Sequence, residues 1–77
     1  MNPFIHLRLY ASLGRFSPEA GENHAIRSGI SIQELVADLQ IPMDQVKLIF
    51  IKGQRKNLES RVYGGERVAI FPPVGGG

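Results

Sequence analysis

Apolar and polar residues alternate near the start of the chain in the pattern of a half-buried β-strand. In FIHLRLY (4–10), the apolar set Ile5, Leu7 and Leu9 alternates with the set His6, Arg8 and Tyr10. A period of two places the sets on opposite faces of a strand. The residues ASLGRFSPEAGEN (11–23) are rich in glycine and proline and are expected to form a loop or a long hairpin connection. HAIRSG (24–29) predicts a short second strand that ends at Gly29.

A helix is predicted from Ser31 onward. The stretch SIQE places Ser31 and Glu34 as a capping box, in which each side chain satisfies a backbone donor. Apolar residues then follow at helical spacing and form one stripe: Ile32, Leu35, Val36 and Leu39. Pro42 is expected to end the helix, because the residue before a proline is disfavoured in helical conformation.

The second half of the chain predicts two more strands. QVKLIFIKGQRKN (45–57) is rich in β-branched and aromatic residues as far as Gly53, which indicates a central strand and then a turn. Leu58 and Val62 are expected to fill the core, and Gly64–Gly65 to form a turn. RVAIF (67–71) predicts the last strand, with Val68 and Ile70 on one face and Ala69 and Phe71 on the other.

The order of these elements is β-β-α-β-(short β)-β. One helix can cover one face of a sheet, so the pattern predicts a two-layer α+β domain. If the first and last strands lie side by side, the fold is a β-grasp, although periodicity alone does not fix that pairing. We expect one domain over residues 1–73 and a flexible C-terminal tail over 74–77, since 77 residues allow a single modest core.

Composition excludes several classes of function. The chain has no cysteine, hence no disulfide and no thiolate nucleophile, and no apolar run of the roughly 20 residues that span a bilayer. No signal peptide is visible, which favours a cytoplasmic location. The net charge is only +2, and the basic group Lys52, Arg55, Lys56 and Arg61 lacks interleaved aromatic residues. We therefore expect no nucleic-acid or membrane partner, although an acidic protein surface would suit these charges.

Candidate catalytic groups are sparse. Neither His6 nor His24 has a second ligand or a carboxylate at a spacing typical of a metal site or a triad. Glu34 and Asp38 form an ordinary helix-surface pair. Gly64–Gly65 has no following helix or suitably placed lysine, so a turn is favoured over a phosphate loop. We expect a chain that binds no metal and is not itself an enzyme.

The C-terminal residues FPPVGGG carry the most specific pattern. Pro72 and Pro73 lack backbone donors, so the last strand cannot continue past Phe71. Val74 offers one apolar contact. The glycines that follow (Gly75–Gly77) lack Cβ atoms and form a thread that could enter a narrow channel and deliver its carboxylate there. The alternative is a frayed or engineered tail.

The stretch GGERVAIFPPVGGG resembles the C-terminal signature of the small subunit of molybdopterin synthase. LRLYASLGRF, SIQELVADLQIP and VKLIFIKGQ also fall where that family has its first strand, helix and middle strand. The chain therefore resembles sulfur carriers of the MoaD/ThiS type. The resemblance implies a ubiquitin-like β-grasp with a mixed sheet of four to five strands packed on one main helix.

The resemblance also implies a mechanism. In such carriers an E1-like adenylyltransferase uses ATP and Mg²⁺ to adenylate the terminal glycine, here Gly77. The acyl-adenylate becomes a thiocarboxylate, whose sulfur passes to the pterin dithiolene in a complex with the large synthase subunit. The carrier itself binds no cofactor. Gly75 and Gly76 would thread the tail, while the docking surface would comprise Phe71, Ala69, Tyr10, Arg8, Pro72, Pro73 and Val74.

Several alternatives stay open. Phe71 could instead pack under a loop of its own domain. Gly75 stands where the synthase subunit often has alanine, and triple glycine also occurs in carriers of the thiamin pathway, which generally lack the double proline. Molybdenum or tungsten cofactor assembly is therefore the first expectation, with thiamin or another sulfur route second. A ubiquitin-like protein modifier and a plain interaction module with an irrelevant tail are further readings.

Overall fold

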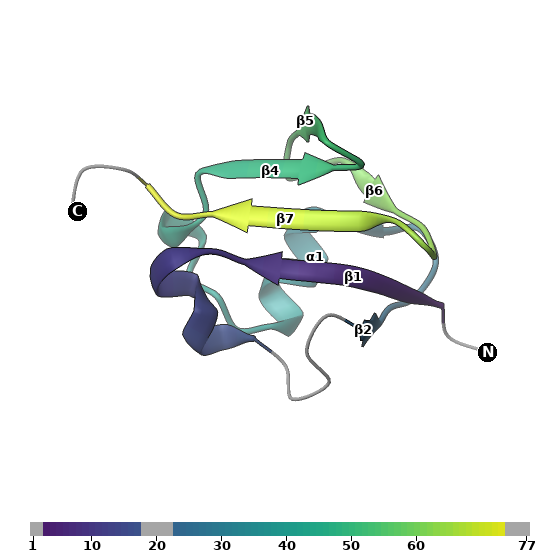
Figure 1. Ribbon diagram of the computed structural model, residues 1–77, viewed down its shortest axis with the longest axis horizontal. Helices are drawn as coiled ribbons and strands as arrows, with labels where there is room; N and C mark the ends of the chain where they lie inside the picture. The colour runs from purple at the N-terminus through teal and green to yellow at the C-terminus, as the bar shows by residue number, and fades with distance from the viewer. Residues whose placement is uncertain (1–2, 18–22, 74–77) are drawn as a thin grey trace.

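The computed structural model describes residues 3–17 and 23–73. Figure 1 shows its secondary structure, in which the short 3₁₀ helices are labelled η in the text. The elements in chain order are β1 (Phe4–Leu9), η1 (Ala11–Phe16), β2 (Asn23–Ala25), β3 (Ile30–Ser31), α1 (Ile32–Asp38), η2 (Met43–Gln45), β4 (Leu48–Ile51), β5 (Gln54–Lys56), β6 (Arg61–Val62) and β7 (Arg67–Phe71).

Five strands form one mixed sheet in the order β2-β1-β7-β4-β5, and β3 pairs with β6 in a separate two-stranded sheet. β1 and β7 are parallel, with Leu7 opposite Val68 and Leu9 opposite Ile70, whereas the other pairs are antiparallel. Figure 1 shows β1 and β7 side by side and α1 behind the sheet. The α+β prediction is confirmed, and the first and last strands have the adjacency that a β-grasp requires.

The core lies between the sheet and α1. Ile5 and Leu7 of β1 are buried, as are Val68 and Ile70 of β7, so the alternation predicted for both strands is confirmed. α1 contributes its apolar stripe from the other side, with Ile32, Leu35 and Val36 all fully buried. Val62 is also fully buried, while Leu58 and Leu39 are partly buried against the cluster.

The predicted loop after β1 instead contains a 3₁₀ helix. The Leu13 amide donates to the Tyr10 carbonyl oxygen at 3.0 Å, and Leu13 is fully buried. Leu13 and Phe16 are three residues apart, and a helix of three residues per turn places such residues on one side. This three-residue spacing of apolar side chains favours a 3₁₀ helix over the irregular loop that the glycine and proline content predicts. The remaining residues of the predicted loop include 18–22, which lie outside the described residues.

The second predicted strand is shorter than expected and a further strand follows it. The strand spans Asn23–Ala25, and the next residue, Ile26, is buried while its amide donates to the Pro3 carbonyl oxygen at 2.8 Å. Gly29, at φ +85°, precedes the separate strand β3, whose residue Ile30 lies opposite Val62 of β6. Two-residue strands leave no alternation to detect, which is why the sequence pattern did not predict β3 or the strand character of β6.

α1 begins as predicted but ends earlier. Its capping box is complete: the Glu34 amide donates to Ser31 Oγ and the Ser31 amide to Glu34 Oε1, each at 3.1 Å. The helix ends at Asp38, with Leu39 as its C-cap, rather than near Pro42. Gln40 adopts φ +62°, and the amides of Gln40 and Ile41 donate to the carbonyls of Ala37 and Val36. This is a Schellman ending with glutamine in the left-handed position that glycine usually fills.

The capping box should make stability depend on pH. The pKa of Glu34 is lowered, chiefly because its carboxylate accepts hydrogen bonds from the Ser31 backbone and side chain, and also because Arg27 and Arg61 are positively charged. A carboxyl group whose pKa is lower in the folded state than in the unfolded state stabilises the protein fully at pH values above the unfolded-state pKa. This stabilisation is lost as the pH falls through the folded-state pKa. The free energy of unfolding of the wild type, measured in urea, should therefore fall below about pH 4.5. That of Glu34→Gln should fall less.

The matched control for this measurement is Asp38→Asn, which removes a carboxylate from the other end of the same helix, outside the cap. The urea concentration at the unfolding midpoint of Asp38→Asn should fall on acidification as steeply as that of the wild type. Equal acid sensitivity of the wild type and Glu34→Gln would contradict the role given to the cap.

Candidate functional site

The end of β7 is held on both sides at the point where the tail begins. The Lys47 amide donates to the Phe71 carbonyl oxygen at 2.9 Å, and the Tyr10 amide donates to the Ile70 carbonyl oxygen at 3.1 Å. Pro72 and Pro73 follow at once and have no N–H to donate, so the chain leaves the sheet there. The root of the tail is therefore fixed by two neighbouring segments of the domain.

The predicted tail lies outside the described residues. Val74, Gly75, Gly76 and Gly77 are the residues concerned. Their threading, docking and carboxylate roles, together with the division into a domain over 1–73 and a flexible tail over 74–77, stay predictions.

Phe71 lies in an aromatic cluster on the face of the sheet opposite α1. Its ring stacks on Tyr10, with centroids 4.2 Å apart and planes at 8°, and meets the edge of Phe50 at 5.8 Å and 84°. The Arg8 guanidinium carbon lies 5.9 Å from the centre of the Tyr10 ring. Phe71 remains partly exposed, as does Tyr10 at 37%.

Four of the residues predicted to form a docking surface are thus brought together. Phe71, Tyr10 and Arg8 are joined by the ring contacts just described. Ala69, the fourth, lies opposite Arg8 on β1 and opposite Phe50 on β4. We define the aromatic face by these side chains: Arg8, Tyr10, Phe50, Ala69 and Phe71. The apolar centre and the arginine at its margin have the composition of an interface core and rim.

A basic rim adjoins the aromatic face. A shallow hollow is lined by His6, Arg8, Tyr10 and Arg67. His6 is exposed and lies opposite Arg67. Among the described strand residues that point to this side of the five-stranded sheet there is no carboxylate, since the acidic Glu66 precedes β7 and pairs with Lys52 at 3.6 Å.

Sequence reasoning missed Phe50 and Arg67. The alternation in LIFI (48–51) places Phe50 on the same side as Leu48, but the neighbouring strand is not encoded in that period. The register Phe50↔Ala69 supplies the missing information. Arg67 occupies the outward position two residues before Ala69, so its face was already implied by the alternation predicted for β7.

No catalytic or metal-binding cluster is found in the described part of the chain. No group of three or more His, Asp or Glu side chains there could hold a metal ion. His24 lies opposite Ile5 and His6 opposite Asn23 in the β1–β2 pair, so the two imidazoles belong to opposite faces. No helix of the described residues is long and apolar enough to cross a membrane.

The Gly64–Gly65 pair forms a turn. Gly65 has φ +83°, and its amide donates to the Phe4 carbonyl oxygen at 2.8 Å. The Glu66 carboxylate accepts from the Tyr63 amide across the same turn. A Cβ added to Gly64 would lie 2.6 Å from Pro3 Cβ. Gly64 therefore allows close packing against Pro3, and Gly65 adopts the left-handed backbone of the turn. The predicted turn is confirmed.

The described residues have the architecture of a ubiquitin-like β-grasp protein. The first and last strands, β1 and β7, are parallel neighbours in the sheet, and one α-helix covers the sheet. Residues 2–75 match the family model described as Mut7-C ubiquitin. The chain therefore belongs to the Mut7-C ubiquitin family. A search of curated proteins found no significant match.

Two solved structures from Haloferax volcanii share the fold. The solution structure of the HVO 2177 protein aligns over 99% of this chain and 88% of its own, with 17% identity and a TM-score of 0.70. The crystal structure of SAMP1 aligns over 96% of this chain and 99% of its own, with 18% identity and a TM-score of 0.61. The predicted ubiquitin-like β-grasp is confirmed, and these matches are consistent with the resemblance to MoaD/ThiS-type carriers.

Proposed function

We propose that this protein is a sulfur carrier whose Gly77 carboxylate is converted to a thiocarboxylate and donates sulfur in molybdopterin or tungstopterin assembly. The observation that carries the proposal is that β7 ends at Phe71, within the aromatic face, and that PPVGGG follows it in the sequence. A tail of prolines and glycines rooted next to an apolar, basic-rimmed surface suits a partner that holds the domain and threads the terminus.

The chemistry would be supplied by partners. In an E1-like adenylyltransferase, the Gly77 carboxylate attacks the α-phosphorus of Mg²⁺-bound ATP and releases pyrophosphate. A sulfur nucleophile then forms the C–S bond as the bond to AMP breaks. Hydrosulfide would give the thiocarboxylate directly, whereas a protein persulfide would give an acyl disulfide, from which a second thiol of the partner releases the thiocarboxylate by forming a disulfide with the persulfide's inner sulfur. Splitting one hard step into two easier ones is the general advantage of covalent activation. The carrier contributes an exposed terminal carboxylate that can reach the partner's active site, and it is not itself an enzyme. Because the partner uses ATP, the reaction would take place where ATP is present, as in the cytoplasm.

The next partner would be the large subunit of molybdopterin synthase, which receives the thiocarboxylate tail. The double proline favours this route, while the triple glycine also suits a carrier of the thiamin pathway. The aromatic face would serve both partners in turn, because each must grip the domain while its channel holds the tail.

Intact mass spectrometry tests the proposal. After incubation with the cognate activating enzyme, Mg²⁺-ATP and a sulfur donor, the protein should exchange one oxygen for one sulfur. The same mixture without ATP is the control and should leave the mass unchanged. An unchanged mass in the complete mixture, with an enzyme that is active on its own carrier, would contradict the proposal.

A ubiquitin-like protein modifier is the second candidate, favoured by membership in a ubiquitin family and by the terminal glycines. Its activated carboxylate would form an amide bond with a lysine amine instead of accepting sulfur. Stable isopeptide adducts on other proteins, mapped by tryptic peptides that retain the glycine remnant, would favour this function.

A further inference from the structure

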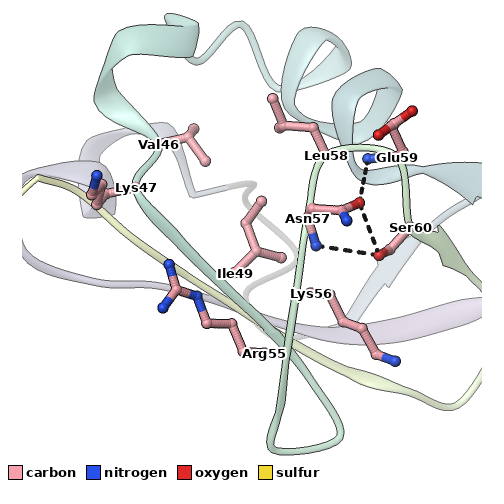
Figure 2. Close-up of a pocket in the computed structure, with 9 residues that line it drawn as sticks. All are labelled: Val46, Lys47, Ile49, Arg55, Lys56, Asn57, Leu58, Glu59 and Ser60. Atoms are coloured by element: carbon pink, nitrogen blue, oxygen red, sulfur yellow. Dashed lines mark hydrogen bonds between the residues drawn. The ribbon is translucent and has the colours of Figure 1, made fainter.

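A groove lies beside β5, on the side of the sheet to which Ile49 of β4 points (Figure 2). It forms because β4 and β5 separate: their pairing ends at Ile49↔Lys56, and the chain then turns at Asn57 toward α1. The groove encloses about 780 Å³, within the range of ligand sites in proteins. The residues that line it are Val46, Lys47, Ile49, Arg55, Lys56, Asn57, Leu58, Glu59 and Ser60.

One wall of the groove is held in place by hydrogen bonds. Asn57 Oδ1 accepts from the Glu59 amide at 2.9 Å, and Ser60 Oγ accepts from the Asn57 amide at 3.2 Å. The wall is also attached to α1, because the Leu58 and Ser60 carbonyls accept from the amides of Gln33 and Ile32 at 2.9 Å. The groove is therefore formed before any ligand arrives, which lowers the entropic cost of binding.

The floor of the groove is aliphatic. Figure 2 shows Val46, Ile49 and Leu58 converging on its centre. Ile49 is 4% exposed, and Val46 and Leu58 are half-buried against the core. The floor can take one or two aliphatic side chains of a ligand.

The rim of the groove is cationic and lacks acidic partners. Lys47, Arg55 and Lys56 are exposed. Within residues 3–17 and 23–73, the side-chain ion pairs are Arg27–Glu34 and Lys52–Glu66, so these three rim cations have no carboxylate partner there. Glu59 is the one acidic lining residue, and Figure 2 places its carboxylate at the far side from Lys47 and Arg55.

We propose that this groove binds an extended acidic peptide segment of a partner protein, with an aliphatic side chain between carboxylates. The aliphatic side chain would sit on the floor and the carboxylates would pair with the rim. A nucleic acid fits less well, because none of the nine lining residues is aromatic and bases gain much of their affinity from stacking. Ile49 and its paired residue Lys56 lie on the face opposite Phe50, whereas Arg55 is paired with Phe50 at the margin of the aromatic face. A partner held on Ile49 and Lys56 therefore leaves Tyr10 and Phe71 open.

The test is an NMR titration of the full-length protein with an acetylated, amidated peptide of sequence Asp-Glu-Asp-Leu-Asp-Glu-Asp. Shift changes should centre on Lys47, Ile49 and Leu58. Replacing every acid of the peptide by its amide should abolish binding. Lys47→Glu and Lys56→Glu should each weaken binding about tenfold or more, because each turns an attraction into a repulsion, and Lys56 is paired with the floor residue Ile49.

Arg67→Glu is the matched control, since it makes the same charge change on the opposite side of the sheet and should alter the affinity by less than about twofold. Equal weakening by all three reversals would overturn the proposal, because binding would then follow net charge alone. Shifts centred on the aromatic face would also overturn it, as would tighter groove binding by an oligothymidine. A variant lacking Gly76 and Gly77 should bind the peptide unchanged, which separates this outcome from that of the sulfur-carrier proposal.

Discussion

A variant with one alanine appended after Gly77 is expected to accept no sulfur, although its domain folds and docks as before. In the proposed reaction the carboxylate must reach the α-phosphorus of ATP at a fixed distance from the docked domain. An added residue moves the carboxylate along the channel, and a Cβ widens a thread that glycine keeps narrow. Intact mass and pyrophosphate release measure the loss, with thermal unfolding as the check on the fold.

An appended glycine is the companion variant, since it lengthens the tail without widening it. Loss in both variants assigns the requirement to the position of the carboxylate, and loss with alanine alone assigns it to the width of the thread. Undiminished sulfur uptake by the alanine variant would contradict the requirement for a carboxylate on Gly77 at a fixed distance from the docked domain.

Phe71→Ala should weaken binding of the activating partner by about 2 kcal/mol, or roughly thirtyfold. Phe71 is the central ring of the aromatic face, between the stacked Tyr10 and the edge-on Phe50. Aromatic residues at the centre of an interface contribute most when a polar rim excludes water, and Arg8 stands at this margin. Removing the ring should also cost about 1–2 kcal/mol of stability through the lost aromatic pairs.

Phe4→Ala provides the matched control. Phe4 belongs to the same outward-facing set of β1 and is 58% exposed, but it lies at the opposite end of that strand from Tyr10 and the tail root. The same atoms are removed, and partner binding should change by less than about 0.5 kcal/mol. Calorimetric titration with the activating enzyme compares the two, and equal losses would show that the aromatic face is not the docking surface.

Local patterns in the sequence were sufficient for much of the fold. The alternation in β1 and β7 and the Ser31–Glu34 capping box depend on residues within a few positions of one another, and the structure confirms them. The end of α1 was not predictable in the same way. Gln40 takes a left-handed conformation that its side chain does not favour, and burial of the following Ile41 accompanies it.

The residues of the candidate site also divide into those that local sequence patterns place and those that only tertiary contacts place. The docking role of Phe71, Ala69, Tyr10 and Arg8 was predicted from the family resemblance, and strand alternation placed the four residues on one outward face. Phe50 joined them only through the antiparallel register of β4 and β7, a contact between segments about twenty residues apart in sequence. The groove beside β5 depends on where two paired strands separate, and no periodicity in the sequence reports that.

The central place of β7 has a consequence for biosynthesis. β7 is flanked by β1 on one side and β4 on the other, so a chain that lacks its last strand has a sheet split in two. Contacts between such distant segments also form late and slowly during folding. A nascent or truncated chain therefore cannot display the aromatic face, and an activating enzyme that selects this surface would reject unfinished molecules without any separate proofreading step.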